Sequence, residues 1–371
     1  MESNELVRLA LRELRRRPGR FGVATAALAV LALLLLFLGG LLDGLTAGST
    51  GAVRAQDRDG FVLSSTARDS FFRSRITPDV RAQVEAVPGV SNVSGFGLTF
   101  GSAKIDGSDT DVGVAGYERR SSVLPDPPAP GEGYADVRLE SAGVTIGDTV
   151  QIGPSSPIRI VGFVKDTRYL QNALLWVDLD TWRSTTKLIR PESTVGDGIV
   201  QALGFDVASG ADIAKVVVSI DAATNSITSS LSSDDTINAT PGVASQNSVF
   251  TLIIVTTLLV AALVVSLFFA FLTLERVPMY GVLKAIGSGS GQLFAGVLLQ
   301  SIVVSVIAFA IGLGIVAPLA LSAPESLPFS LSAQRIIVTI VGLGSSAILG
   351  GLVSLRRVIK IDPAAAIGGG T

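Results

Sequence analysis

Cysteine and histidine are both absent from the 371 residues, and Met279 is the only methionine beyond Met1. Without cysteine, no disulfide framework, thiolate nucleophile or Cys-based metal site can form. Without histidine, the commonest general base and transition-metal ligand are missing. These two absences exclude Ser-His-Asp hydrolases and most other hydrolases and zinc enzymes.

Charge is also scarce. Charged residues make up 16% of the chain, against about 25% in a typical soluble domain. Hydrophobic residues reach 48%, and the mean hydropathy is +0.55. The net charge of −2 and a pI near 5.4 argue against a nucleic-acid partner, which favours basic surfaces. The composition is that of a membrane protein rather than of a purely soluble one.

The hydrophobic residues concentrate in four runs without a charge, at residues 21–42, 249–274, 293–321 and 336–355. About 20 helical residues cross a bilayer core of about 30 Å, so each run is long enough to span it. Buried helices of a soluble protein are the alternative, which four such runs disfavour. A signal peptide is the alternative for the first run, but its 22 residues favour a signal anchor. We predict four transmembrane helices, over residues 21–45, 248–274, 293–321 and 336–355.

Basic residues near the ends of these runs predict the orientation. Residues 1–20 carry six arginines, and basic residues recur in the 275–292 loop and the 356–371 tail. The 322–335 loop has only Arg335, at its end. We therefore expect a multi-pass protein of the plasma membrane with both termini cytoplasmic. Residues 1–20 either form an amphipathic helix on the cytoplasmic surface or serve as a plain basic flank.

The long segment 46–247 lies outside the membrane in this topology and carries a net charge of about −7. Its patterns are mixed. Residues 78–87 have apolar positions at helical spacing and end at Pro88-Gly89, a stop signal. Residues 144–152 and 158–164 are β-branched runs separated by a Gly/Pro/Ser loop, which is typical of strands. The segment is therefore predicted to be an extracytoplasmic α+β domain, in two lobes.

The 275–292 loop that follows the second span is a candidate contact for a cytoplasmic partner. Tyr280, Leu283 and Ile286 recur at helical spacing, and Glu275, Arg276 and Lys284 flank them. The glycines at 287–291 follow no strand and precede no Lys-Ser/Thr, so they do not form a nucleotide-binding loop. The chain also lacks the G-x-x-x-x-G-K-[ST] motif. We predict a non-catalytic subunit that binds no cofactor or metal itself.

Two segments carry a family resemblance: GVLKAIG at 281–287 and IDPAAAIGGG at 361–370. With the order of one span, a large outer domain and three spans, the chain resembles the FtsX-like/MacB-type permeases of ABC transporters over nearly its whole length. The resemblance implies a MacB-like outer domain and a homodimer in membrane lipid. It also implies two copies of a cytoplasmic ABC ATPase, which holds ATP-Mg and contacts the 275–292 coupling loop.

Within that family the chain is most similar to permeases of Gram-positive haem-efflux pumps. The shared segments are looser: residues 283–287, 298–300, 147–148 and 162–169, and the short Gly-Gly ending. The resemblance implies efflux of a hydrophobic substrate, most of all haem, taken laterally from the membrane. The alternatives are export of a lipid, peptide or antibiotic, or signalling to an extracellular enzyme or sensor kinase without transport.

Haem is usually held by His, Cys, Met or Tyr, and this chain departs from that pattern. The ligands left on the outer side are Tyr117, Tyr134, Tyr169, a carboxylate such as Asp43, or none. We predict a lateral pocket where the chain enters and leaves the outer domain. Gly39-Gly40 lacks side chains there, which allows close helix approach or a gap beside the first span. The candidate substrate-binding residues are Phe37, Asp43, Arg54, Arg58, Gln246, Asn247, Phe250 and Thr251. The alternative is that the phenylalanines face lipid and Asp43 caps the helix.

Overall fold

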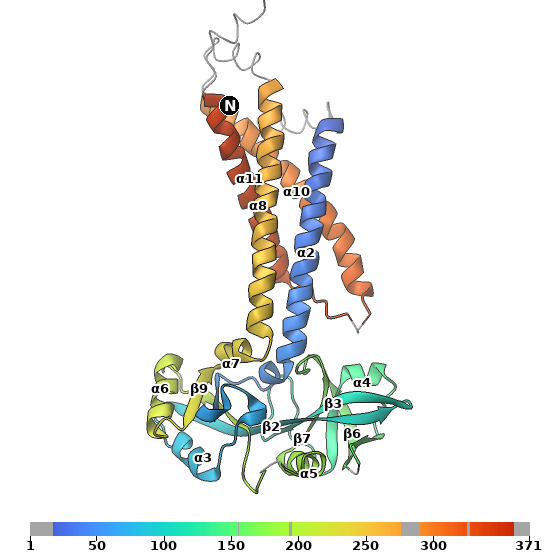
Figure 1. Cartoon of the computed structure of the whole chain (residues 1–371), viewed down its shortest axis with the longest axis vertical. Helices are drawn as coiled ribbons and strands as arrows, with labels where there is room; N and C mark the ends of the chain where they lie inside the picture. The colour runs from blue at the N-terminus through green and yellow to red at the C-terminus, as the bar shows by residue number, and fades with distance from the viewer. Residues whose placement is uncertain (1–17, 155, 193–194, 276–289, 325–326, 360–371) are drawn as a thin grey trace, which may run out of the picture. The chain divides into compact units, whose positions relative to one another are not determined.

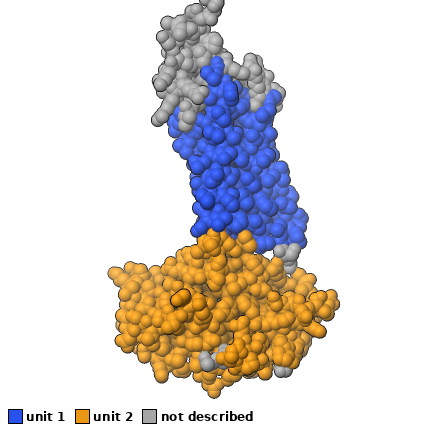
Figure 2. Space-filling model, viewed as in Figure 1, with its two compact units in different colours: residues 1–44, 247–371 blue, residues 45–246 orange. Residues whose placement is uncertain are grey.

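The computed structural model describes residues 18–154, 156–192, 195–275, 290–324 and 327–359. The chain divides into two compact units (Figure 2). The membrane unit comprises Met1–Gly44 and Asn247–Thr371, and the outer domain comprises Leu45–Gln246. Residues 1–17 of the amphipathic helix predicted at 1–20, most of the coupling loop and the tail after residue 359 lie outside the described residues.

In the described part of the membrane unit, four long helices lie together (Figure 1). They are α2 (Pro18–Ala55), α8 (Val243–Glu275), α10 (Ser290–Ser322) and α11 (Ala333–Ile359). Each has a window apolar and long enough to cross a bilayer, which confirms the predicted four spans. Helix α2 continues past the predicted end of its span at residue 45 through residues 46–55, and α8 begins at residue 243, ahead of the predicted start at residue 248.

Small residues bring the four helices of the membrane unit together. A Cβ on Gly312 of α10 would lie 2.9 Å from the backbone nitrogen of Leu33 in α2. A Cβ on Gly350 of α11 would lie 2.7 Å from the carbonyl oxygen of Ala262 in α8. Only glycine allows backbones this close. Around these contacts α2, α8, α10 and α11 share one apolar cluster, in which Phe21 meets Phe268 edge-on.

The outer domain is an α+β fold built on one nine-stranded sheet, as predicted in class (Figure 1). Its strands are β1 (Gly60–Ser64), β2 (Val90–Ile105), β3 (Ser108–Tyr117), β4 (Glu132–Asp136), β5 (Thr149–Ile152), β6 (Ser156–Val164), β7 (Ala173–Asp178), β8 (Ala202–Val207) and β9 (Thr228–Ser232). Its helices are η1 (Ser65–Ala67), η2 (Phe71–Arg73), α3 (Pro78–Glu85), α4 (Val137–Ser141), α5 (Leu179–Ile189), α6 (Ile213–Ala223) and α7 (Ser233–Ala239).

The long strand β2 organises the sheet. Its second half pairs with β3, and the pairing continues through β7, β4, β6 and β5 back to β2 at Ala103↔Ile152. Six strands therefore close into a ring, which removes their free edges. The first half of β2 pairs with β8, which leads to β1 and β9. The two lobes expected from the sequence are thus two halves of one sheet that share β2.

Apolar side chains fill both faces of this sheet. On β1, Val62 belongs to one core cluster, while Phe61 and Leu63 belong to the other, because successive side chains of a strand point to opposite faces. Helix α5 closes one of these cores with the fully buried Trp182. A Cβ on Gly97 or Gly116 would collide with the Trp182 side chain. Glycine at these two strand positions therefore makes room for the indole.

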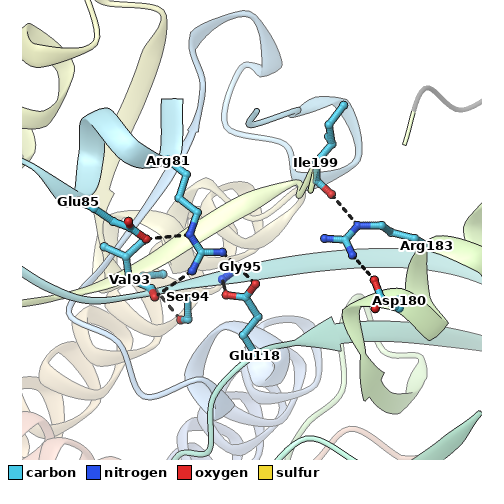
Figure 3. Close-up of polar contacts among 10 residues, drawn as sticks. Arg81, Glu85, Val93, Ser94, Gly95, Glu118, Asp180, Arg183 and Ile199 are labelled. Carbon is cyan, nitrogen blue, oxygen red and sulfur yellow. Dashed lines mark hydrogen bonds and ion pairs between the residues drawn. The ribbon is translucent and has the colours of Figure 1, made fainter. Parts of the chain in front are cut away.

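Polar contacts hold α3 and α5 in place (Figure 3). The Arg81 guanidinium of α3 donates to Glu118 at 2.9 Å and to Glu85 at 2.8 Å. Glu118 also accepts from the backbone N–H of Gly95 at 2.6 Å. The hydrogen bond with Glu118 raises the pKa of Arg81, against the opposing effect of burial. In α5, Arg183 likewise joins Asp180 to the Ile199 carbonyl.

Candidate functional site

Within the membrane unit, residues 327–335 lie against the part of α2 that leads into the outer domain. The backbone N–H of Ser330 donates to the Gly40 carbonyl at 2.9 Å. A side chain on Gly40 would collide with the Phe329 ring, and one on Gly44 with the Pro328 backbone. The glycines at this end of α2 therefore leave room for residues 327–335. We call this segment the strap.

Asp43 of α2 holds the strap electrostatically. Its two carboxylate oxygens accept from Arg335, at 2.5 Å from Nη2 and 3.4 Å from Nε. It also accepts from the Ser332 hydroxyl at 2.8 Å. The Ser332 oxygen in turn accepts from the Arg335 N–H at 3.1 Å, which caps the first turn of α11. With side chains only 18% and 22% exposed, this is a half-buried ion pair.

An aromatic contact lies beside this ion pair. The rings of Phe37 in α2 and Phe329 in the strap stack with centroids 5.6 Å apart and an interplanar angle of 30°. Both side chains are half-buried. The side chains that we predicted on α2 for a substrate, Phe37 and Asp43, are therefore both engaged by residues of the strap.

The predicted partners on α8 are less enclosed. Asn247 and Phe250 are half-buried and Thr251 is exposed. Phe250 takes part in none of the ring contacts found among the described residues. The preceding Gln246 belongs to the outer domain, and its buried Oε1 has no hydrogen-bond partner among the described residues.

The two predicted arginines belong to the outer domain, and each has partners there. Arg54 donates to the Ala47 carbonyl at 2.9 Å and to the Thr50 hydroxyl at 3.3 Å. Arg58 forms an ion pair with Asp206 at 2.9 Å. Its side chain is only 8% exposed. Both arginines thus have a structural role within the outer domain.

Two of the tyrosines named as possible iron ligands belong to the core of the outer domain. Tyr117 and Tyr169 are buried, and burial raises the pKa of both phenols. The Tyr117 hydroxyl donates to the carbonyls of Pro125 and Asp126, at 3.1 and 3.2 Å. Iron binds tyrosine as phenolate, so an environment that holds these phenols neutral disfavours them as ligands. Tyr134 is half-buried on β4.

The described spans contain few ionisable residues. Asp43, Arg54 and Arg335 are those within the candidate span limits, and Asp43 and Arg335 pair with each other. Ionisable groups within spans are costly and usually mark a functional position or a mutual pair. The remaining polar side chains there are neutral, such as Gln300, Ser301 and Thr339.

The predicted coupling residues lie at the border of the described chain or beyond it. Glu275 is the last residue of α8, and its side chain is not described. Arg276, Tyr280, Leu283, Lys284 and Ile286 lie outside the described residues.

Sequence reasoning missed the strap residues Phe329, Ser332 and Arg335. It treats Arg335 only as a charge at the end of the 322–335 loop. A usable signal was present, because a lone arginine next to an apolar run and a lone aspartate at the end of another require a partner. Their separation of 292 positions along the chain concealed that they are partners.

Comparisons with known proteins show what the chain is similar to. Residues 251–363 match the FtsX-like permease C-terminal family. The chain is 23% identical over 367 residues to a protein of Staphylococcus epidermidis named hemin transport system permease protein HrtB, covering 98% of this chain and 99% of that protein. It is 26% identical over 379 residues to an uncharacterized ABC transporter permease of Mycobacterium tuberculosis, covering 97% and 99%.

Among solved structures, the periplasmic region of MacB from Actinobacillus actinomycetemcomitans is 12% identical, with a TM-score of 0.34, covering 47% of this chain and 89% of that one. Residues 251–363 therefore form an FtsX-like permease domain, and the relatives matched over their full length, together with the four apolar helices, indicate an ABC transporter permease of the plasma membrane.

Proposed function

We propose that this permease is the membrane subunit of an efflux transporter that extrudes haem, taken laterally from the membrane. Full-length similarity to a permease named for hemin transport supports this substrate. The substrate is also chemically suitable, because haem is flat, largely apolar and soluble in lipid. In this proposal a separate cytoplasmic ATPase supplies the energy, and the permease acts as a homodimer.

The observation that carries the lateral route is the ion pair at the end of α2. Asp43 and Arg335 neutralise each other, and the side chains at residues 21–42, 243–272, 298–322 and 336–352 of the candidate spans are all neutral. A hydrophilic solute would find no charged path through such a bundle. A substrate that already resides in the lipid needs none.

The proposed slot uses residues of the membrane unit. Phe37 and Phe250 would stack on the porphyrin, with Asn247 and Thr251 as polar neighbours. For a porphyrin to reach Phe37, Phe329 must first leave the ring on which it now stacks. Once Arg335 moves with the strap, Asp43 becomes a free oxygen ligand for iron. The displaced guanidinium is then able to hold a propionate by charge-assisted hydrogen bonds.

The test is a haemin titration of the purified full-length protein, followed by the Soret band. Phe37→Ala and Asp43→Ala should weaken binding, and so should Phe250→Ala. Phe271→Ala is the matched control, because Phe271 lies on the same helix and is 67% exposed. Equal binding by Phe250→Ala and Phe271→Ala would remove Phe250 from the site. A wild-type protein that does not bind haemin would remove haem, and would leave a lipid, peptide or antibiotic as the exported substrate.

The proposed coupling to ATP has its own test. Two ATPase subunits holding ATP-Mg would each receive one coupling loop, with Tyr280, Leu283 and Ile286 seated in an apolar groove and with Glu275, Arg276 and Lys284 orienting it. Leu283→Asp would place a carboxylate in that groove, at a cost of several kcal/mol unless it is neutralised.

ATPase stimulation by the permease should therefore be lost in Leu283→Asp while the permease still folds. Val282→Asp adds the same charge one position away from the predicted apolar stripe and should retain most of the stimulation. If both variants pull down and stimulate the ATPase normally, the loop is not the contact.

A further inference from the structure

The last turns of α2 belong to the outer domain, where the loop between β6 and β7, residues 165–172, binds them. The backbone N–H of Gln171 donates to the Gly48 carbonyl at 2.9 Å. The N–H of Ala52 donates to the Arg168 carbonyl, also at 2.9 Å. The loop therefore packs backbone against backbone on this end of α2, and its side chains are held beside the helix.

Basic side chains gather at this contact. Arg54 of α2 and Lys165 of the loop are exposed, and Arg168 is half-buried. The charges of Arg168 and Asp166 are close enough to Arg54 to act on it. The side chains of Lys165 and Arg168 form no hydrogen bond or ion pair with the described residues. These four residues carry a net charge of about +2, in a domain whose net charge is about −7.

The position of Arg54 along α2 sets the depth of this charge. Helix α2 is continuous from Pro18 to Ala55, and Leu42 ends its uncharged run. The Arg54 side chain extends back along the helix, and its Nη2 donates to the Ala47 carbonyl at 2.9 Å. Ala47 lies five residues past Leu42, or about 8 Å along the axis. Since the headgroup layer on each side of a bilayer is about 5–8 Å thick, this guanidinium lies at the depth of lipid phosphates.

The chemistry of the cluster suits a phosphate that is held by something else. A guanidinium donates to phosphate in a fixed fork, and an ammonium adds a compact positive charge. Because Arg54 and Lys165 are exposed, the cluster has no enclosing wall that would retain a free phosphate. A phospholipid needs no such wall, since its acyl chains already keep its phosphate at this depth.

We propose that Arg54, Lys165 and Arg168 form a headgroup site that binds the phosphate of anionic phospholipids around α2. Phosphatidylglycerol keeps the full negative charge of its phosphate. Phosphatidylcholine brings a cation of its own toward the basic side chains, so it is the poorer ligand. The site depends neither on haem nor on an ATPase, and it lies wholly on residues of the outer domain.

The experiment is native mass spectrometry of the purified full-length protein in detergent, titrated with phosphatidylglycerol, phosphatidylcholine or soluble glycerol phosphate. Phosphatidylglycerol should bind more tightly than phosphatidylcholine, and glycerol phosphate should bind weakest. Arg54→Gln, Lys165→Gln and Arg168→Gln should each weaken phosphatidylglycerol binding about fivefold, the loss expected for one basic residue near a membrane surface. Thermal unfolding checks that each variant keeps its fold. If Arg54→Gln fails to fold, the two loop variants decide.

Lys215→Gln is the matched control for Lys165→Gln. Lys215 is an exposed lysine of α6, and α6 packs through Val216 on the other core cluster from the one that holds Ala52 of α2. This control should leave phosphatidylglycerol binding unchanged. Added salt should weaken binding in the wild type by screening the charges, and should do so less in the Lys165→Gln/Arg168→Gln double variant.

Three results would overturn the proposal. The first is equal binding of phosphatidylglycerol and phosphatidylcholine by the wild type. The second is an equal effect of Lys165→Gln and Lys215→Gln. The third is glycerol phosphate bound as tightly as phosphatidylglycerol, which would make the ligand a soluble anion instead of a lipid.

Discussion

The two units of this permease satisfy their polar side chains in different ways. In the outer domain, carboxylates and guanidinium groups bridge separate elements, as Arg81 and Glu118 do between α3 and the end of β3. In the membrane unit, hydroxyls bond to the carbonyls of their own or a neighbouring helix, as Ser346 does to Leu258. The ion pair described there, Asp43–Arg335, lies at the end of a span.

The difference arises from the surroundings of each unit. Water stabilises an exposed or half-exposed charge in the outer domain, so an ion pair there adds little free energy. A charge within an apolar bundle has no such alternative and needs a partner. Apolar packing is alike in both units, since Gly97 admits Trp182 just as Gly350 admits the α8 backbone. The units therefore differ in electrostatics more than in packing.

The largest expected effect is all-or-none: an introduced cysteine either reacts with a reagent outside the cell or does not. Because the chain contains no cysteine, single substitutions report cleanly. Cysteine at Pro130 or Ser330 should react with an impermeant thiol reagent added to intact cells. Cysteine at Ala10, Ser288 or Gly368 should react only after the membrane is opened. Reaction of the Ser288→Cys variant in intact cells would contradict the predicted orientation.

The next largest effect is the loss of unfolding free energy when an ion pair is broken, which should differ between the two units. Arg335→Ala leaves Asp43 half-buried without its partner, and should lower the free energy of unfolding by roughly 2–4 kcal/mol. Arg81→Ala in the outer domain should cost about 1 kcal/mol or less, since both its side chain and that of Glu118 are about 30% exposed.

Thermal unfolding of the detergent-solubilised protein measures both. Adding Asp43→Ala to Arg335→Ala should recover part of the loss, because the unpaired carboxylate is then gone. A double-mutant cycle that gives the Asp43–Arg335 pair no more coupling energy than Arg81–Glu118 would refute the difference between the units.

Alkaline pH should cause a smaller difference in stability between the two units. The folded outer domain raises the pKa of Tyr117 and Tyr169, so the folded state binds more protons than the unfolded state above about pH 10. The stabilisation is complete below that pH. As pH rises further it is lost, by about 1.4 kcal/mol per pH unit for each tyrosine.

Tryptophan fluorescence can follow this loss selectively, because Trp176 and Trp182 are the two tryptophans of the chain and both lie in the outer domain. Tyr117→Phe should be slightly less stable than the wild type at neutral pH, since its hydrogen bonds are lost. Its stability should fall less steeply between about pH 10 and 11.5, because one fewer phenol then titrates. A slope equal to that of the wild type would show that Tyr117 is not responsible.

The smallest expected effect concerns the hydroxyls between helices. Ser346 of α11 donates to the Leu258 carbonyl of α8 at 3.0 Å. Ser346→Ala should cost about 0.6 kcal/mol, the average for such bonds in a membrane. Its neighbour Ser345 is exposed and bonds only to Val341 of its own helix, so Ser345→Ala should be nearly neutral. Equal losses in thermal unfolding would mean that the interhelical bond contributes nothing specific.

Local patterns predicted much of this fold. The helix expected at residues 78–87 is α3, and the β-branched run at 158–164 lies within β6. The run at 144–152 predicts its strand less accurately, since only residues 149–152 form β5. Closure of the six-strand ring through Ala103↔Ile152 left no local signal. Pairing between distant strands depends on the whole sheet, which short windows of sequence do not contain.

The candidate substrate site likewise combines features that local sequence predicts with contacts that only the folded chain makes. Composition and charge placed aromatic side chains and a carboxylate near the ends of the first two spans. Only the folded chain brings Phe329 to Phe37 and Arg335 to Asp43.

The order of residues alone establishes the membrane character, the four spans and the large outer domain, because transfer of a run of apolar side chains into lipid depends on that run and little else. The choice of partners required the folded chain, as for the strap on α2 and the buried phenols of Tyr117 and Tyr169. Each of these depends on contacts between residues that are distant in sequence, where distance, desolvation and shape decide which groups meet.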